Sequence, residues 1–156
     1  MIILVLVPII LLFGLVSTLP DIFADQSVKT KSIKCKGKAM CIVATIDRII
    51  DGDTIVVNNK KIRLSLTSTP ESYQKGGIDA TDFTKYLCRT GYSVTVDQDD
   101  KQPYDKYKRV LGMVYCSGKI LNAELLYAGH AHISKYFCKI SEFATEDWAI
   151  KYGCKV

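Results

Sequence analysis

The chain has 156 residues, which fits one domain, and its 21 lysines and arginines outnumber its 16 acidic residues to give a net charge of +5. This modest basic excess suits a polyanionic partner without identifying one. The six cysteines contain no CxxC pair, which argues against a cysteine-based metal site.

The first 19 residues are almost wholly apolar. They predict either a secretory signal peptide, cleaved near Ala24, or an uncleaved N-terminal anchor, since about 20 apolar residues span a bilayer. Removing residues 1–24 deletes one charged residue, Asp21, and raises the net charge to +6. Either way we expect a secreted or extracytoplasmic protein. Residues 25–40 are polar and lysine-rich, and are expected to form a linker to a domain at 41–156.

All six cysteines follow the apolar segment. An even number of cysteines in a small exported domain favours disulfides, although six cysteines allow about 15 pairings and sequence alone does not choose among them. The pairing we expect joins cysteines that are neighbours in the sequence: Cys35–Cys41, Cys88–Cys116 and Cys138–Cys154.

Short runs rich in isoleucine, valine and threonine, separated by turn signals, predict most of the domain to be strands. In chain order we expect strands over 41–50, 54–57 and 60–66, a helix over 79–90, strands over 92–96 and 110–115, and helices over 121–128 and 141–152. The Asn58-Asn59 pair tolerates positive φ and suits a hairpin. This order favours an α+β fold that is mainly β, a short twisted barrel capped by helices.

Three segments carry the residues for chemistry: DGDTI at Asp51–Ile55, RLSLTSTPE at Arg63–Glu71 and DKYKR at Asp105–Arg109. Carboxylates hold a hard cation and activate water, while guanidinium groups neutralise phosphate oxygens. Arg63 also interrupts an otherwise apolar strand, where a charge needs a partner or a function. The combination predicts metal-assisted phosphodiester chemistry.

Together with Leu121–Gly129, these segments resemble the staphylococcal nuclease (thermonuclease) family, from about Ala44 to Gly153. The resemblance implies an OB-type five-stranded barrel with about three helices. It also implies a Ca²⁺-dependent endonuclease that acts on single-stranded or locally open DNA and RNA. We expect a monomer, which contacts a membrane only through residues 1–24 if these are retained.

The resemblance assigns roles to single residues. Asp53 matches a metal-binding aspartate, and Thr69 matches a residue whose backbone carbonyl faces the metal. Glu71 matches the general base that polarises the attacking water, and Arg63 and Arg109 match the arginines that brace the phosphate. The residues expected to contact the nucleic acid are Lys106, Tyr107, Lys135 and Phe137.

Ser68 departs from the family pattern, which places a second metal-binding aspartate just before Thr-Pro-Glu. A serine hydroxyl can approach Ca²⁺ but adds no charge, so we expect binding weaker by about 1–3 kcal/mol. Asp51 is an alternative ligand, although its expected role is to shape the turn. Two other functions therefore stay open: a nucleic-acid-binding OB module without catalysis, and a cell-surface domain whose barrel is only a scaffold.

Overall fold

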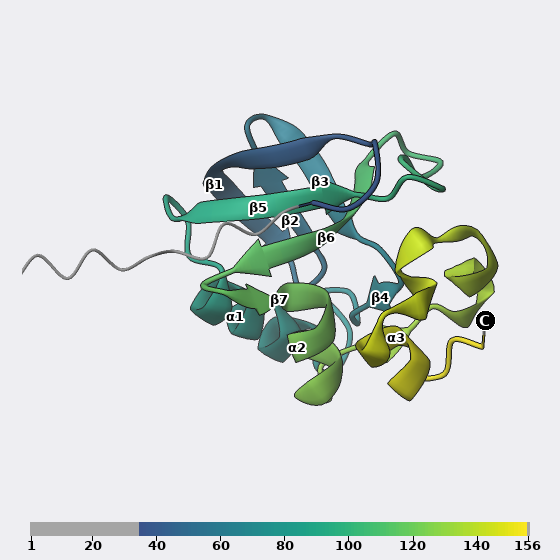
Figure 1. Cartoon of the computed structure of the whole chain (residues 1–156). Coiled ribbons are helices and arrows are strands. Elements are labelled where there is room, and N and C mark those ends of the chain that lie inside the picture. The colour runs from purple at the N-terminus through teal and green to yellow at the C-terminus, as the bar shows by residue number, and fades with distance from the viewer. Residues whose placement is uncertain (1–34, 156) are drawn as a thin grey trace, which may run out of the picture. The chain divides into compact units, whose positions relative to one another are not determined.

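The computed structural model describes residues 35–155 (Figure 1). The expected signal peptide or anchor at 1–24, and the linker as far as residue 34, lie outside the described residues. No helix in the described part of the chain is long and apolar enough to cross a membrane.

Five strands close into a barrel, as expected. Their order is β3-β2-β1-β5-β6, and β6 pairs in parallel with β3 to complete the ring. The barrel strands are β1 (Cys41–Asp51), β2 (Thr54–Val57), β3 (Lys60–Leu64), β5 (Ser93–Gln98) and β6 (Val110–Cys116). The short strand β7 (Lys119–Ile120) pairs antiparallel with the end of β6, while β4 (Thr67–Ser68) and β8 (His132–Ile133) form a separate antiparallel pair.

Short helices gather on one side of the barrel (Figure 1). They are α1 (Gly77–Leu87), α2 (Leu121–Tyr127), α3 (Asp147–Lys151) and the 3₁₀ helices η1 (Lys135–Ile140) and η2 (Glu142–Thr145). The single helix expected over 141–152 is wrong. The Ser141 side chain caps η2 by accepting from the Phe143 amide, and Glu146, with ψ 142°, is extended and separates η2 from α3.

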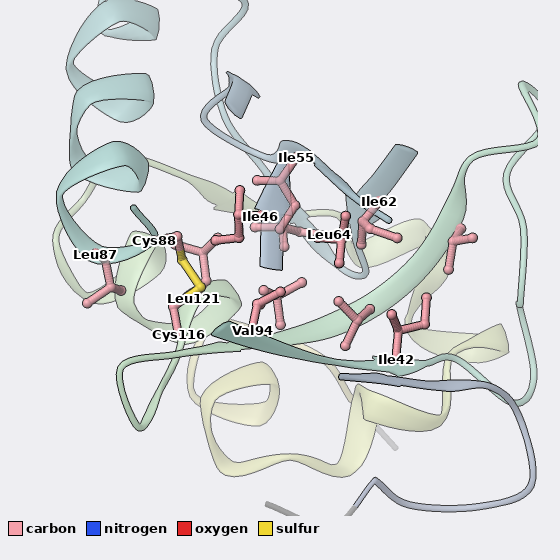
Figure 2. Packing of buried hydrophobic residues seen from close by; sticks show 14 of the residues in the cluster. Ile42, Ile46, Ile55, Ile62, Leu64, Leu87, Cys88, Val94, Cys116 and Leu121 are labelled. Carbon is pink, nitrogen blue, oxygen red and sulfur yellow. A yellow bond between two sulfur atoms is a disulfide. The ribbon is translucent and has the colours of Figure 1, made fainter. Parts of the chain in front are cut away.

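Branched aliphatic side chains fill the barrel interior (Figure 2). Those that are 0–1% exposed include Ile46, Ile55, Val57, Ile62, Val94 and Val96. On β3 the side chains alternate, so that Ile62 and Leu64 are buried in this core while Lys61 and Arg63 lie on the outer face. The strand alternation thus places a charged residue, Arg63, on the barrel wall without burying it in the core.

The strand expected over 60–66 ends early, at Leu64. Leu66 takes a left-handed conformation with φ 62°, and the Ser65 amide donates to the carbonyl of Gly112 at 2.9 Å. This bend breaks the strand alternation and starts β4 at Thr67. As a result, Ser68 and the residues after it lie outside the barrel ladder.

The three expected disulfides are confirmed, with Cα atoms 5.8, 5.2 and 5.5 Å apart in the pairs Cys35–Cys41, Cys88–Cys116 and Cys138–Cys154. Residues 35–40 were expected to belong to a linker, and this needs correction. The amide of Lys36 donates to the carboxylate of Asp97, and the amides of Lys38 and Ala39 donate to Asp100. The folded domain therefore includes these residues.

Tyr115 on β6 should report on folding at high pH. Burial, with the nearby charges of Asp97 and Glu146, raises its pKa to about 12. Because an exposed tyrosine has a pKa of about 10, the neutral phenol stabilises the fold below that pH, and this contribution is lost as the pH rises toward 12. We expect an ultraviolet titration of the nine tyrosines to end in a late step that Tyr115→Phe removes. An unchanged titration in that variant would contradict the assignment.

Candidate active site

Asp53 and Arg63 form a largely buried ion pair at the β2–β3 hairpin. The hairpin register pairs Thr54 with Arg63, which brings Asp53 beside the guanidinium group. Nη2 of Arg63 lies 2.9 Å from Oδ2 of Asp53, and the side chains are 17% and 8% exposed. Burial raises the pKa of Asp53, and this is opposed by Arg63 and by the Thr69 amide, which donates to Oδ2 at 2.7 Å. The aspartate and arginine expected in the site therefore lie together.

Arg63 also holds the segment that follows the bend at Leu66. Its Nη1 donates to the carbonyl of Thr67 at 2.7 Å, and its Nη2 donates to Oγ of Ser68 at 3.1 Å. The oxygens of Asp53 and Ser68 consequently lie 2.9 and 3.1 Å from the same nitrogen atom. The two side chains expected to bind metal converge on one point.

The turn that carries Asp53 is packed tightly against its neighbours. The Asp53 amide donates to Oδ1 of Asp51 at 3.1 Å, so Asp51 shapes the turn as expected. A Cβ atom on Gly52 would lie 2.8 Å from the side chains of Ala80 and Thr69. Only glycine allows this turn to approach both, and the close approach brings Asp53 against the Thr69 amide.

Glu71 lies on the exposed loop between β4 and α1. Its side chain accepts no hydrogen bond from residues 35–155, and its charge acts to raise the pKa of Arg63, whose pKa is lowered mainly by burial. The backbone of this loop is fixed: the carbonyl of Glu71 accepts from the Gln74 amide at 2.8 Å, and a Cβ on Gly77 would clash with that carbonyl. Glu71 thus presents a free carboxylate near the Asp53–Arg63 pair.

Arg109 is held by Asp105, a residue whose role the sequence analysis missed. Nε of Arg109 lies 2.6 Å from Oδ2 of Asp105, and the amides of Tyr107 and Arg109 both donate to Oδ1 at 2.9 Å. Burial alone would raise the pKa of Asp105, but the hydrogen bonds and charge of Arg109 hold the pKa below its usual value. An aspartate four residues before an arginine, at the end of a charged loop, was the available signal.

Thr54 connects the two arginines. Its hydroxyl lies 3.4 Å from Nη1 of Arg109 and 3.2 Å from Oδ1 of Asp53, which pairs with Arg63. The two guanidinium groups come from segments far apart in the sequence. Their arrangement leaves cationic nitrogens facing one space, where a phosphate group can bind.

That space is a cleft of about 350 Å³. Both arginines line it, together with Lys106, Tyr107 and Phe137. Tyr107 and Phe137 are 68% and 39% exposed and offer aromatic faces on which bases can stack. Five of the residues expected on sequence grounds to bind phosphate or bases therefore line one cleft.

Lys135 is placed differently from the other expected nucleic-acid contacts. It is exposed, it does not line the cleft, and its side chain lies close to Gly153 near the end of the described chain. It begins the 3₁₀ helix η1. Lys135 therefore lies outside the cleft, whereas Phe137, two positions later, lines it.

The oxygen atoms beside Arg63 fit a calcium ion in their chemistry. Within residues 35–155, no three acidic, histidine or cysteine side chains gather into a metal-binding group. The converging atoms are a carboxylate of Asp53 and a hydroxyl of Ser68, both hard donors of the kind that Ca²⁺ prefers. A guanidinium nitrogen already lies between them, so the position accommodates positive charge. The site has one carboxylate where the resemblance implies two.

Comparison with known proteins agrees with this geometry. The family model described as "Staphylococcal nuclease homologue" matches residues 61–148, more than half of the chain. The chain belongs to the staphylococcal nuclease family. The matched stretch includes Arg63, Ser68, Glu71 and Arg109, whereas Asp53 lies just before it.

Three curated relatives give the extent of the similarity to other staphylococcal nuclease homologues. The chain is 30% identical over 122 residues to "Thermonuclease" of Staphylococcus intermedius, which covers 72% of this chain and 69% of the relative. It is 37% identical over 110 residues to "Endonuclease YncB" of Bacillus subtilis, covering 64% of this chain and 51% of the relative. It is also 37% identical over 101 residues to "SPbeta prophage-derived endonuclease YokF" of the same organism, covering 58% and 33%. The chain thus spans about half, or less, of the length of these two Bacillus proteins.

Proposed function

We propose that this chain is an exported endonuclease that hydrolyses phosphodiester bonds of DNA and RNA with the help of Ca²⁺. One observation carries the proposal: Arg63 and Arg109 face one cleft beside the buried Asp53 and the free carboxylate of Glu71. The names of the relatives, endonuclease and thermonuclease, support it. The three disulfides support export, because such bonds persist in oxidising compartments.

In the proposed reaction the two arginines bind the scissile phosphate and stabilise the negative charge that develops on its oxygens. Glu71 accepts a proton from the attacking water, a role that suits an exposed carboxylate with no structural partner in the described chain. Tyr107 and Phe137 stack on the adjoining bases, and Lys106 contacts a phosphate. Calcium, held by Asp53, Ser68 and the Thr69 carbonyl, supplies further positive charge beside the phosphate when it is bound.

A second candidate function is a nucleic-acid-binding module that has lost turnover. Ser68 favours it, because the serine leaves Asp53 as the only carboxylate, among residues 35–155, that pairs with Nη2 of Arg63. This alternative predicts salt-sensitive binding to single strands without cleavage. We rank it second because Glu71, Arg63 and Arg109 are all present, and binding alone does not require a free carboxylate beside a phosphate site.

The test is cleavage of fluorescent single-stranded DNA by the purified, disulfide-bonded protein. Calcium is titrated from micromolar to tens of millimolar, with a chelator series and a mock purification from cells that lack the chain as controls. We expect cleavage that requires calcium and is absent from the mock preparation. Intact DNA over the whole calcium range, with folded protein that still binds the strand, would favour the second candidate and overturn the first.

Restoring a carboxylate at position 68 should strengthen calcium binding. Ser68→Asp adds a charged oxygen beside Asp53, and Arg63 already donates to this position, so the new charge has a partner. We expect the Kd for Ca²⁺ to fall by about 5- to 150-fold, which corresponds to about 1–3 kcal/mol. Calorimetric titration without nucleic acid measures this. Ser72→Asp, on the exposed loop, is the matched control, and equal tightening in both variants would contradict the assignment.

A further inference from the structure

A second groove, of about 380 Å³, adjoins the first cleft, and Tyr107 and Arg109 line both. The remaining residues that line it are Asn59, Lys60, Lys61, Tyr104, Lys108 and Val110. Four of its side chains are cationic, and none of the residues that line it is acidic. The proposed function uses only the two shared residues, so the basic character of this groove is unexplained by it.

The cations meet because of the way the barrel closes. Strands β3 and β6 run parallel, with Ile62 paired to Val110. Lys60 and Lys61 come just before Ile62, and Lys108 and Arg109 come just before Val110. The pairing therefore brings all four residues to the same end of the two strands, where they line the groove. Segments nearly fifty positions apart thus form a single basic surface beside the catalytic arginine.

This surface continues the line of charge that begins at Arg63. Lys61 and Arg63 lie two residues apart on the outer face of β3, a separation of about 7 Å along the strand. That spacing is comparable to the length of one extended nucleotide. A strand whose phosphate binds at Arg63 and Arg109 can therefore place a neighbouring phosphate near Lys61.

The lysines of the groove are free to bind an anion. They are exposed, and no carboxylate of residues 35–155 forms an ion pair with Lys60, Lys61 or Lys108. The nearby carboxylate of Asp47 is engaged with the hairpin, where it accepts from the Asn59 amide at 2.7 Å. Lys108 has φ 61°, a backbone conformation that favours glycine, so its side chain is not selected by the turn.

Aromatic faces accompany the charges. Tyr104 and Tyr107 are 52% and 68% exposed and both line the groove. The guanidinium carbon of Arg109 lies 5.5 Å from the centre of the Tyr107 ring, which places this ring at the boundary between the two hollows. A basic track with aromatic side chains along it is the arrangement by which proteins bind single strands without reading their sequence.

We propose that this second groove binds the part of a nucleic-acid strand that extends beyond the cleaved phosphate, with phosphates at Lys60, Lys61 and Lys108 and a base on Tyr104. The inference rests on the proposed function and refines it: the substrate is a polynucleotide that occupies both hollows. Short fragments, which fill the first cleft alone, bind more weakly. The enzyme accordingly favours internal bonds of long strands.

The test compares two labelled substrates, a dinucleotide and a single-stranded DNA of about 16 nucleotides, the upper site size of one OB fold. The variant combines Lys60→Thr, Lys61→Thr and Lys108→Gly, which suit a strand and a left-handed turn respectively. On the long strand we expect KM, and the Kd from fluorescence anisotropy, to rise about tenfold. The slope of log Kd against log[salt] should become shallower by about 2, since each of the three lost phosphate contacts contributes about 0.7 to it. Dinucleotide cleavage stays at the wild-type rate.

The control variant removes the same charge elsewhere, by Lys85→Gln, Lys119→Thr and Lys151→Gln, none of which lines either hollow. Equal weakening in both variants would reduce the effect to net charge and overturn the inference, as would wild-type behaviour of the groove variant on the long strand. If the wild-type protein cleaves neither substrate, the proposed function fails. The anisotropy measurement then still decides the groove, because it needs no turnover.

Discussion

Replacing Glu71 by glutamine is expected to lower kcat for DNA cleavage by about 10²- to 10⁴-fold, the usual contribution of a general base. Glutamine keeps the size of the side chain but cannot accept the proton of the attacking water. The Glu71 side chain is exposed and accepts no hydrogen bond from the described part of the chain, so its replacement should leave the fold intact. Single-turnover cleavage at saturating calcium isolates the chemical step from binding.

Two companion measurements make this result specific. The Kd for the uncleaved strand should change little in Glu71→Gln, because the arginines and aromatic residues that bind it are untouched. Asp79→Asn, which removes another exposed carboxylate from the start of α1, should retain the wild-type kcat. A Glu71→Gln variant with full kcat would show that a different group deprotonates the water.

Local patterns predicted the barrel well because its strands carry their own signals. All four residues of β2 are buried and β3 alternates, and the turn between them holds Asn58 and Asn59, whose φ values are 48° and 60°. Asparagine tolerates this conformation, so the turn could be read from the two residues alone. Arg63 was predictable because a charge on a barrel strand requires a partner, whereas Asp53 was assigned from the family resemblance.

The features that were missed depend on contacts between distant segments. The bend at Leu66 requires a leucine in a left-handed conformation, which no local preference favours. The break at Glu146 depends on Ser141, which caps a separate short helix. The pairing of Cys88 with Cys116 was expected correctly, but the sequence alone could not select it, since it depends on where α1 and β6 end in space.

The basic groove illustrates the same limit for the site. Lys60, Lys61 and Lys108 are visible in the sequence as members of two unrelated charged segments. Only the parallel pairing of β3 with β6, which closes the barrel, brings them to one groove. Likewise, the structure identifies Asp105 as the partner of Arg109. The Asp105 carboxylate accepts hydrogen bonds from the Arg109 amide and from the Arg109 side chain.

Arg109 offers a cleaner test of phosphate binding than Arg63. Arg63 donates to the Thr67 carbonyl and to Ser68 and pairs with the buried Asp53. Its removal would leave a buried charge without a partner, at a cost of about 3–5 kcal/mol, so lost activity and lost stability would be confounded. Arg109 is 26% exposed and pairs with one carboxylate in the described chain, that of Asp105.

Arg109→Lys is therefore expected to lower kcat/KM by about 10²- to 10³-fold while the fold is retained. Lysine keeps the charge but loses the planar fork that binds two phosphate oxygens at once, and its ammonium group does not reproduce the contact between Nε and Asp105. Steady-state cleavage measures the loss, and thermal unfolding by circular dichroism verifies the fold. A loss confined to KM would show that Arg109 binds the strand without stabilising the transition state.

The pH dependence of cleavage and a variant of Asp105 together test whether Asp105 acts by orienting the Arg109 side chain. Because the pKa of Asp105 is held below its usual value, its carboxylate is ionised throughout the neutral range and its stabilising effect is lost only as the pH falls below about 4. The loss of kcat/KM in Arg109→Lys should therefore be constant between about pH 6 and 9, where Asp105 does not titrate.

Asp105→Asn keeps the guanidinium group but removes its charged partner, so a smaller loss of kcat/KM than in Arg109→Lys is expected. An equal loss in both variants would mean that alignment by Asp105, and not the fork of Arg109 itself, limits the rate.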